Sequence, residues 1–374
     1  MSKLQELIDR LCPNGVEFKP LGEVCEIKRG ERVTKNQVNN IGSYPVISGG
    51  VTPMGYLEKF NREANTITVA QYGTAGFVNW QDKRFWANDI CYSLFPADVL
   101  DNRFLYYFLK NSSPIIDKLV NRDAVPFHLP QNNISNISIP IPPLEVQDEI
   151  VKILDRFADY AAELQAELQA RRLQYEYYRN LLLTFNPSAY GCGTDDAQKD
   201  CLWLTLKDVA IIKNGKDYKH CNNGDYPVYG SGGIMTYVDQ YCYDKPTVIL
   251  PRKGSIGKIH YLDTPFWNVD TAYYTIINTQ LIVPKFLYYF LTTIDLEKKN
   301  CGKGAVPSLT QDILYRISIP IPPLELQEKI VAILDRFETL VNDLSKGLPA
   351  EIEAVKARYE YYRNKLLGFK EKPA

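Results

Sequence analysis

The sequence predicts an α+β fold in which two similar globular domains are separated by an antiparallel two-helix coiled coil, so that the chain carries an internal pseudo-two-fold repeat. Two repeated segments are the basis of this prediction. The segment ISIPIPPLEVQDEIVKILDRF at 137–157 recurs as ISIPIPPLELQEKIVAILDRF at 317–337, and YEYYRN at 175–180 recurs at 359–364. The chain has 374 residues, which is enough for two domains and the helices that these segments predict.

Prolines exclude the start of the repeated segment, in both of its copies, from the centre of a sheet. A proline lacks the amide donor that a central strand needs, so we expect only an edge strand here. These prolines are Pro140 and Pro142 in the first copy and Pro320 and Pro322 in the second. A helix is expected to begin at Pro143 and at Pro323, because proline is well suited to the first helical turn.

A seam of apolar residues at alternating steps of three and four follows each proline segment, and this spacing is typical of a coiled coil. The residues predicted to pack against the partner helix are Leu154, Phe157, Ala161, Leu164, Leu168, Tyr175 and Tyr178 in the first copy and Leu334, Phe337, Val341, Leu344, Val355, Tyr359 and Tyr362 in the second. Two such seams most simply bury each other as an antiparallel pair about 60 Å long. Two unconnected helices, each lying on its own domain, are the alternative.

The second seam contains a four-residue insertion, because two successive steps of four flank Leu348. Such an insertion interrupts a heptad repeat. Gly347 and Pro349 lie within it, and both residues favour a break in a helix. We therefore expect a break near 347–349, with a new helix beginning at Pro349.

The globular parts repeat as well. A strand, glycine turn and strand are predicted at 66–80 and again at 247–261, and FLYYFL recurs at 104–109 and 286–291 as a short buried helix. The predicted boundaries are 1–142 for the first domain, 143–185 for a central helix, 186–322 for the second domain, and 323–370 for a C-terminal helix. Residues 186–200 are polar and contain glycine, as expected of a linker.

Composition and motifs exclude several classes of protein. No segment is long and apolar enough for a membrane span, and no signal peptide is recognisable, so we expect a cytoplasmic protein. The eight cysteines form no CxxC pair and are expected to be reduced thiols, and with three histidines no metal site is predicted. The segment 254–258 does not match the phosphate-loop motif, because Arg252 stands where that motif needs glycine. No catalytic constellation is found.

Basic and hydrogen-bonding residues gather in the predicted turns, where the two halves differ most. Arginine and lysine can bind phosphates or guanine edges, and glutamine or asparagine can read adenine. The candidate DNA-binding residues are Lys28, Arg29, Arg32, Lys35, Gln71, Tyr72, Thr74 and Asn79 in the first half and Lys213, Lys216, Lys219, Arg252, Lys253, Ser255 and Lys258 in the second, with Asn268 a further candidate for reading adenine. A solvated surface cluster is the alternative for any single residue. The net charge of −1 does not by itself favour DNA binding.

The repeated segments resemble the conserved regions of the specificity subunit of type I restriction-modification enzymes. The similarity rests on PIPPLEVQDEIVKILDRF, PIPPLELQEKIVAILDRF and LPAEIEAVKARYEYYRNKLL and covers the whole chain. It implies two target-recognition domains that alternate with a central and a C-terminal conserved helix. It also implies that this subunit has no catalytic activity of its own, and that each domain reads one half of a bipartite, asymmetric sequence in double-stranded DNA.

The resemblance further implies which partners the chain has. The paired helices would fix the gap between the half-sites and dock two modification subunits, and two ATP-dependent restriction subunits would complete the complex. S-adenosylmethionine and ATP would be bound by those partners, so no cofactor is expected in this chain. The main alternative is a non-catalytic structural adaptor that holds two protein partners without reading DNA.

Overall fold

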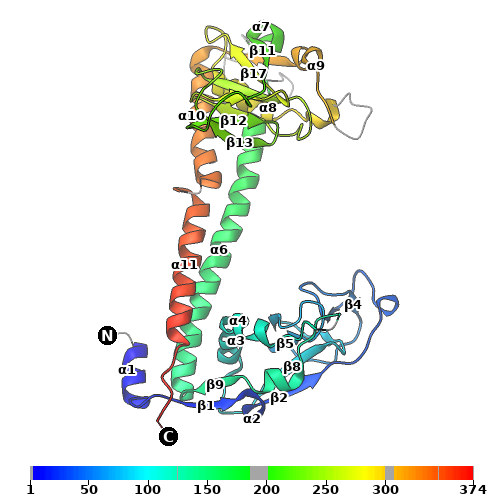
Figure 1. Cartoon of the computed structure of the whole chain (residues 1–374), viewed down its shortest axis with the longest axis vertical. Coiled ribbons are helices and arrows are strands. Elements are labelled where there is room, and N and C mark those ends of the chain that lie inside the picture. The colour runs from blue at the N-terminus through cyan, green and yellow to red at the C-terminus, as the bar shows by residue number, and fades with distance from the viewer. Residues whose placement is uncertain (1–2, 124, 186–200, 300–306, 344, 374) are drawn as a thin grey trace, which may run out of the picture. The chain divides into compact units, whose positions relative to one another are not determined.

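The chain folds into two compact units (Figure 1). The computed structural model describes residues 3–123, 125–185, 201–299, 307–343 and 345–373. The first unit consists of Met1–Leu164 and Ile352–Ala374, and the second of Gln165–Glu351. The units therefore include parts of the long helices that the predicted boundaries set apart as separate segments. The predicted linker at 186–200 and the seam residue Leu344 lie outside the described residues.

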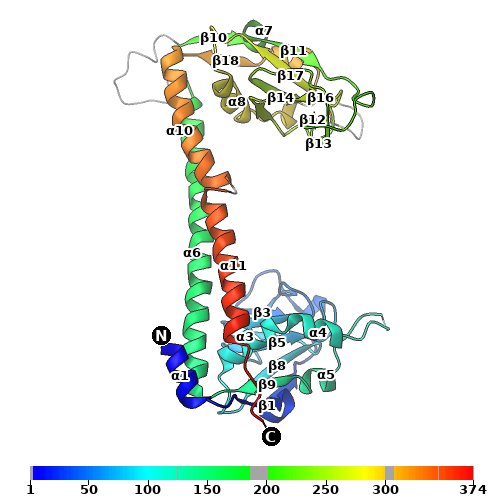
Figure 2. The same ribbon diagram turned by 60° about the vertical axis from the view of Figure 1, so that its left-hand side comes forward.

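The first unit contains two small sheets and a two-stranded ribbon. A four-stranded antiparallel sheet has the order β2-β8-β5-β6, a three-stranded sheet the order β4-β3-β7, and β1 pairs with β9. The strands are β1 (Glu17–Pro20), β2 (Cys25–Arg29), β3 (Tyr44–Ile47), β4 (Tyr56–Leu57), β5 (Thr66–Ala70), β6 (Val78–Gln81), β7 (Trp86–Ala87), β8 (Cys91–Pro96) and β9 (Ser138–Ile141). The short helices are α1 (Lys3–Leu11), α2 (Leu21–Val24), η1 (Lys35–Gln37), α3 (Asn102–Asn111), α4 (Ser113–Leu119) and α5 (Gln131–Ser135). Helix α3 packs against β5, β6 and β8 and closes the core on one face of the larger sheet (Figure 2).

The second unit repeats this arrangement. Its four-stranded sheet has the order β11-β17-β14-β15, its three-stranded sheet the order β13-β12-β16, and β10 pairs with β18. The strands are β10 (Leu202–Thr205), β11 (Ala210–Asn214), β12 (Tyr226–Gly230), β13 (Gly233–Val238), β14 (Thr247–Pro251), β15 (His260–Leu262), β16 (Trp267–Asn268), β17 (Ala272–Ile277) and β18 (Ser318–Ile321), and the short helices are α7 (Leu206–Val209), α8 (Pro284–Thr292), η3 (Glu297–Lys299) and α9 (Gln311–Tyr315). Equal strand order in both units confirms the predicted repeat. The proline strands β9 and β18 lie in two-stranded ribbons, as their missing amide donors require.

Three long helices complete the units: α6 (Leu144–Leu183, 40 residues), α10 (Leu324–Asn342) and α11 (Leu348–Leu366). Helices α6 and α10 begin one residue after the prolines at which they were predicted to begin. The predicted break is confirmed, but α10 already ends at Asn342, before the expected position. The Asp343 carboxylate accepts the amides of Ser345 (2.7 Å) and Lys346 (3.2 Å) and so stabilises a turn. A Cβ atom at Gly347 would lie 2.4 Å from the carbonyl oxygen of Thr339, so only glycine fits there.

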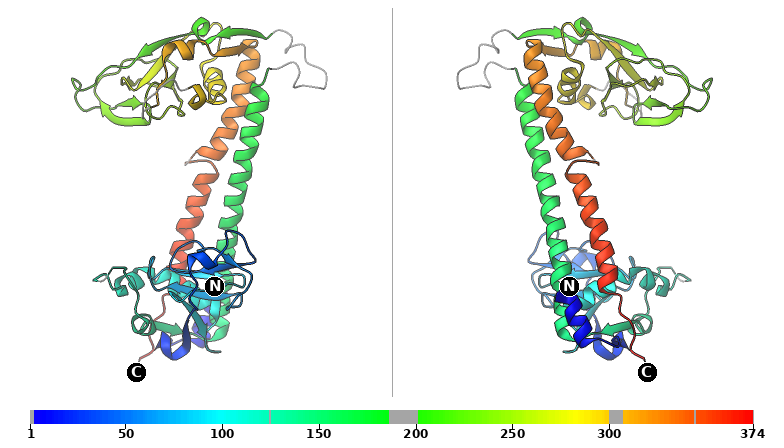
Figure 3. Two further views of the ribbon diagram at one scale, coloured as in Figure 1. Left: turned by 90° about the vertical axis from the view of Figure 1, so that its right-hand side faces the viewer. Right: turned by 90° about the vertical axis from the view of Figure 1, so that its left-hand side faces the viewer.

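Within each unit the apolar seams face each other. In the first unit, Phe157 of α6 lies 5.6 Å from Tyr362 and 6.4 Å from Tyr359 of α11 between ring centroids, and α11 runs antiparallel to this part of α6 (Figure 3). In the second unit, Tyr178 of α6 stacks on Phe337 of α10 at 5.9 Å. The predicted seam residues Leu154, Leu164, Leu168, Leu334, Val341 and Val355 are buried, and Ala161 and Tyr175 are half-buried. The alternative of unconnected helices is therefore wrong.

A buried glutamine ties each proline segment to its unit. The Nε2 atom of Gln147 donates to the carbonyl oxygens of Val99 (2.9 Å) and Pro142 (2.7 Å), and its Oε1 accepts the amide of Asp101 (2.7 Å). Gln327 makes the equivalent bonds in the second unit. Both side chains are fully buried, so each amide depends on these backbone partners for its hydrogen bonds.

Replacing Gln147 with leucine should destabilise the first unit by about 3 kcal/mol, because it leaves the amide of Asp101 and the carbonyls of Val99 and Pro142 without this partner. Urea unfolding of the full chain would measure the loss. Gln169 is exposed on the same helix, and Gln169→Leu should change the free energy of unfolding by no more than about 0.5 kcal/mol. Equal effects of the two substitutions would contradict the role assigned to Gln147.

Among the described residues, no helix combines the length and the apolar character needed to cross a membrane. The six cysteines that the structure describes are all free thiols, and burial raises the pKa of Cys25 and of Cys91 to about 12. The thiols of Cys25 and Cys91 therefore stay protonated at neutral pH and pack in the core of the first unit.

Candidate nucleic-acid interface

The turn between β5 and β6 is the centre of the predicted site in the first unit. Gly73 (φ 74°) and Gly76 (φ 85°) adopt left-handed conformations that favour glycine. A Cβ atom at Gly73 would lie 2.6 Å from the carbonyl oxygen of Gly49. The amide and the hydroxyl of Thr74 both donate to that same oxygen at 2.8 Å. The turn is therefore held against the loop that follows β3, and Thr74, although exposed, uses its hydroxyl to fix the turn.

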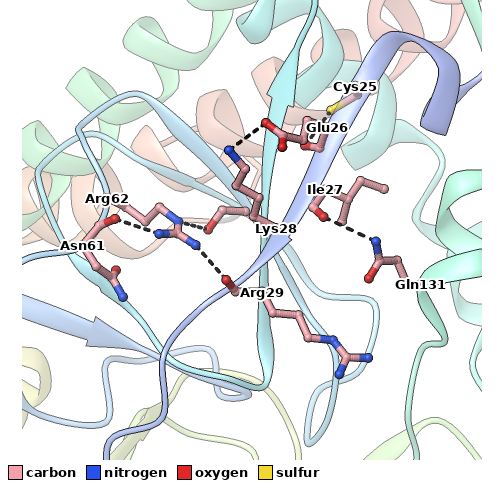
Figure 4. A network of polar contacts seen from close by, with 9 residues as sticks. Cys25, Glu26, Ile27, Lys28, Arg29, Asn61, Arg62 and Gln131 are labelled. Carbon is pink, nitrogen blue, oxygen red and sulfur yellow. Dashed lines mark hydrogen bonds and ion pairs between the residues drawn. The ribbon is translucent and has the colours of Figure 1, made fainter.

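Lys28 and Arg29 are consecutive exposed residues of β2, and their side chains extend in different directions (Figure 4). The Nζ atom of Lys28 pairs with Glu26 at 2.8 Å and lies 5.3 Å from the centre of the Phe95 ring. Arg62, which the sequence reasoning missed, donates to the carbonyl oxygen of Arg29 at 2.7 Å. Its residue type is not repeated in the second half, so no sequence pattern pointed to it. Arg62 fixes the backbone of β2 at its end, whereas the guanidinium of Arg29 extends away from this network.

The remaining candidates of the first unit differ in accessibility. Arg32 and Lys35 are exposed in and beside η1. Tyr72 is half-buried and stacks on His128 at 5.6 Å, a histidine that the sequence reasoning did not include. Asn79 is half-buried on β6.

Two candidates for reading adenine are buried. Only 4% of Gln71 is exposed, because it lies against Tyr92 inside the unit. Asn268 in the second unit is fully buried, and its Nδ2 atom donates to the carbonyl oxygen of Ala272 at 3.0 Å. The expectation that these two amides lie at the surface is wrong, and their contact with adenine stays a prediction. Both residues directly adjoin surface turns, which is why the sequence pattern placed them at the surface.

A depression of about 410 Å³ opens beside the glycine turn of the first unit, with Thr74, Lys110 and Arg122 among the residues that line it. Arg122 pairs with Asp117 at 2.7 Å and lies over the Phe127 ring at 5.6 Å. Burial, together with the charge of Arg363, lowers the pKa of Lys110. Lys110 and Arg122 line this depression together with Asp117, so cations outnumber carboxylates there, which favours a phosphate group.

In the second unit, the turn after β14 carries the basic cluster that the sequence singled out. Arg252 is half-buried, and its Nη1 atom donates to the carbonyl oxygen of Asp270 at 3.1 Å. The side chains of Lys253, Ser255 and Lys258 are exposed on the same turn. Glu297 lies beside this turn, because a Cβ atom at Gly257 would come within 2.8 Å of its Oε1 atom. Cations nevertheless outnumber carboxylates on the turn itself.

The three other candidate lysines of the second unit lie on and after β11. Lys213 belongs to the strand, Lys216 and Lys219 follow it, and all three are exposed. The carbonyl oxygen of Lys216 accepts the indole N–H of Trp267 at 3.0 Å, which fixes the backbone of this loop. Among the described residues, no cluster of histidine, cysteine or acidic side chains could hold a metal ion.

The sequence matches the type I restriction modification DNA specificity domain twice, at residues 13–171 and 202–354. A relative from Haemophilus influenzae described as a type I restriction enzyme specificity subunit is 32% identical, over 95% of this chain and 96% of the relative. An Escherichia coli type I restriction enzyme specificity subunit is 28% identical, over 99% of this chain and 97% of the relative.

Solved structures agree in fold. The crystal structure of a type I restriction-modification system S subunit from M. genitalium has a TM-score of 0.68 and 22% identity, and the match covers 94% of this chain and 96% of that one. A structure that concerns complex assembly of a type I restriction-modification system has a TM-score of 0.55 and 17% identity, with 95% and 98% covered. At such identities the similarity shows the architecture alone.

Proposed function

Because the chain belongs to the family of type I restriction-modification specificity subunits, which are non-catalytic, we propose that each of its two compact units reads one half of a bipartite DNA sequence. The observation that carries this proposal is the duplication itself. Both units have the same strand order, yet their surface turns carry different side chains, QYGTAGF at 71–77 against RKGSIGK at 252–258. One scaffold with two sets of turns is suited to reading two different sequences.

Helix α6 is the proposed spacer between the two units that read DNA. It is continuous over 40 residues and contributes its first part to one unit and its last part to the other. At about 1.5 Å per residue, such a helix is about 60 Å long, which exceeds one turn of B-DNA. Its length would therefore set the number of unread base pairs between the half-sites.

The basic turns are the proposed phosphate contacts. Fluorescence anisotropy with duplex DNA at increasing salt tests this, using the full chain together with its modification subunits. The logarithm of the affinity should fall linearly with the logarithm of the salt concentration, since each neutralised phosphate releases counterions. Binding that is absent, or insensitive to salt and sequence, would contradict the proposal and favour a protein adaptor.

Two equivalent tyrosine pairs on the long helices are the proposed docking sites for two modification subunits. Tyr177 is 63% exposed and packs edge-to-face with Tyr178 at 5.3 Å, and Tyr361 is 62% exposed and packs with Tyr362 in the same way. Exposed aromatic residues are enriched at protein interfaces. Because each unit carries one pair, two copies of the same partner would bind.

These partners would bind S-adenosylmethionine, two restriction subunits would use ATP, and the complex would act in the cytoplasm on the DNA that it reads.

Replacing Tyr177 or Tyr361 with alanine should each weaken the binding of one modification subunit by about 2 kcal/mol, roughly thirtyfold, because a central aromatic contact is lost. Analytical ultracentrifugation would show the chain with one bound partner at concentrations at which the parent chain binds two. Tyr241→Ala removes another exposed tyrosine outside the helices and serves as the control. If both helix variants bind two partners with unchanged affinity, docking does not use these tyrosines.

A further inference from the structure

One arginine in each unit lies over an equivalent tyrosine, but it comes from a different strand. Arg29 on β2 is the register partner of Tyr92 on β8, and its guanidinium carbon is 5.9 Å from the ring centre. In the second unit, the register partner of Tyr273 on β17 is Asn214 of β11. The guanidinium over Tyr273 belongs to Arg252, which directly follows β14 and lies 5.8 Å from the ring centre.

Gln71 occupies the place of Arg252 in the first unit. Each of these two residues directly follows its strand, β5 or β14, and each backbone carbonyl accepts an amide, from Leu129 or Leu309. The pair beside the tyrosine is therefore arginine and glutamine in the first unit and asparagine and arginine in the second. The arginine therefore approaches the equivalent tyrosine from β2 in the first unit and from the residue after β14 in the second.

The tyrosines hold the arginines and leave most of their N–H donors available. Both rings are buried, and their hydroxyls donate to the carbonyl oxygens of Leu129 (3.1 Å) and Leu309 (3.3 Å), so the rings are fixed. A guanidinium over an aromatic face keeps its N–H donors free at its rim. Arg29 is exposed and hydrogen-bonds the Tyr92 hydroxyl, and Arg252 gives one N–H to the carbonyl oxygen of Asp270. A guanidinium has five N–H donors, so two parallel donors remain for a ligand in each unit.

Two parallel N–H donors on a rigid plane match the O6 and N7 atoms of guanine in the major groove. Fixing the plane in advance reduces the side-chain entropy that binding would otherwise cost. The neighbouring Lys28 and Lys253 are exposed point charges without this geometry, and they suit phosphates.

We propose that Arg29 and Arg252 are specificity-determining residues, each of which reads one guanine in the half-site of its own unit. Because the arginine comes from β2 in one unit and from the end of β14 in the other, the guanine falls at a different place in each half-site. This inference rests on the proposed function, since it requires each unit to read its own half of the sequence.

Methylation of DNA by the full complex tests the inference, with Arg29→Ala, Arg29→Lys, Arg252→Ala and Arg252→Lys compared with the parent chain. Sequencing of the methylated positions gives the recognised motif. Each arginine variant should weaken the preference for guanine at one position of one half-site, by roughly tenfold or more. The base preferences of the other half-site should stay unchanged. Lysine should not restore the guanine preference, because it lacks the planar fork. Thermal melting of each variant confirms that it folds.

Lys28→Ala and Lys253→Ala are the matched controls. Both should lower affinity for all sequences and reduce its salt dependence, with the motif unchanged. An arginine variant that keeps the parent motif, or that relaxes a base other than guanine, would overturn the inference even when the parent chain gives a clear bipartite motif. If the parent complex gives no such motif, the proposed function itself fails, so the two failures are distinguishable.

The double substitution Arg29→Asn with Gln71→Arg gives the first unit the same pair of residues as the second. In the half-site of the first unit, the preferred guanine should then move to a new position. This position should correspond to the one that the guanine has in the half-site of the second unit. A first half-site in which the guanine stays at its parental place would contradict the proposed exchange between strands.

Discussion

Replacing Gly30 with alanine should destabilise the first unit by about 3 kcal/mol, a large part of the stability of a typical domain. A Cβ atom at Gly30 would lie 2.0 Å from the carbonyl oxygen of Ala87 and 2.3 Å from that of Asn88. These are backbone atoms, so they cannot rotate away as a side chain could. The amide of Gly30 also donates to the carbonyl oxygen of Cys91 at 3.2 Å, which prevents the strand from withdrawing without loss of that bond. Urea unfolding of the full chain would measure the change.

Gly215 occupies the same place in the second unit, where a Cβ atom would lie 2.1 Å from the carbonyl oxygen of Val269. Gly215→Ala should therefore cost the second unit about as much. Gly50 and Gly232 are the matched controls, because a Cβ atom there would meet nothing closer than 3.4 Å and 4.0 Å, and neither residue has a left-handed φ. If Gly30→Ala were no more harmful than Gly50→Ala, the close backbone packing beside β7 would be contradicted.

Inserting four residues into α6 beside Leu168 should lengthen the gap between the half-sites by about two base pairs. Four residues add about 6 Å of helix and slightly more than one turn, so the seam residues on either side keep nearly the same direction. A base pair rises about 3.4 Å along B-DNA. Methyl transfer by the full complex to duplexes whose half-sites are separated by different gaps would measure the preferred gap.

The control for this insertion leaves the length of α6 unchanged. Gln165 and Gln169 are exposed on α6, and replacing both with alanine changes its surface without adding residues. This variant should keep the parental gap. If the lengthened chain also prefers the parental gap, α6 does not set the spacing.

Much of the fold could be predicted because the two halves repeat each other. The prolines of β9 and β18 exclude a central strand, the apolar seams predict the long helices, and Gly347 and Pro349 mark the break between α10 and α11. These features depend on local backbone chemistry, so the sequence shows them directly. The end of α10 was placed too late because the turn depends on the side chain of Asp343, which no periodicity reports.

The candidate site could be predicted only in part. The basic residues of the surface turns are exposed as expected, apart from the half-buried Arg252. Gln71 is buried, however, because it packs on Tyr92, and this contact exists only once β5 and β8 have paired. The arginine beside the equivalent tyrosine is Arg29 in the first unit and Arg252 in the second, and this difference also depends on strand register. Alignment of the two halves sets Arg29 opposite Asn214 and Gln71 opposite Arg252, but it does not show that both arginines reach equivalent tyrosine rings.

Long-read methylation sequencing of cells with and without the gene tests most directly whether the two units read separate halves of one DNA sequence. We predict one methylated motif that depends on the gene and consists of two unlike halves, separated by a fixed number of base pairs of any sequence. A single uninterrupted motif, or a methylation pattern that is the same without the gene, would contradict this result.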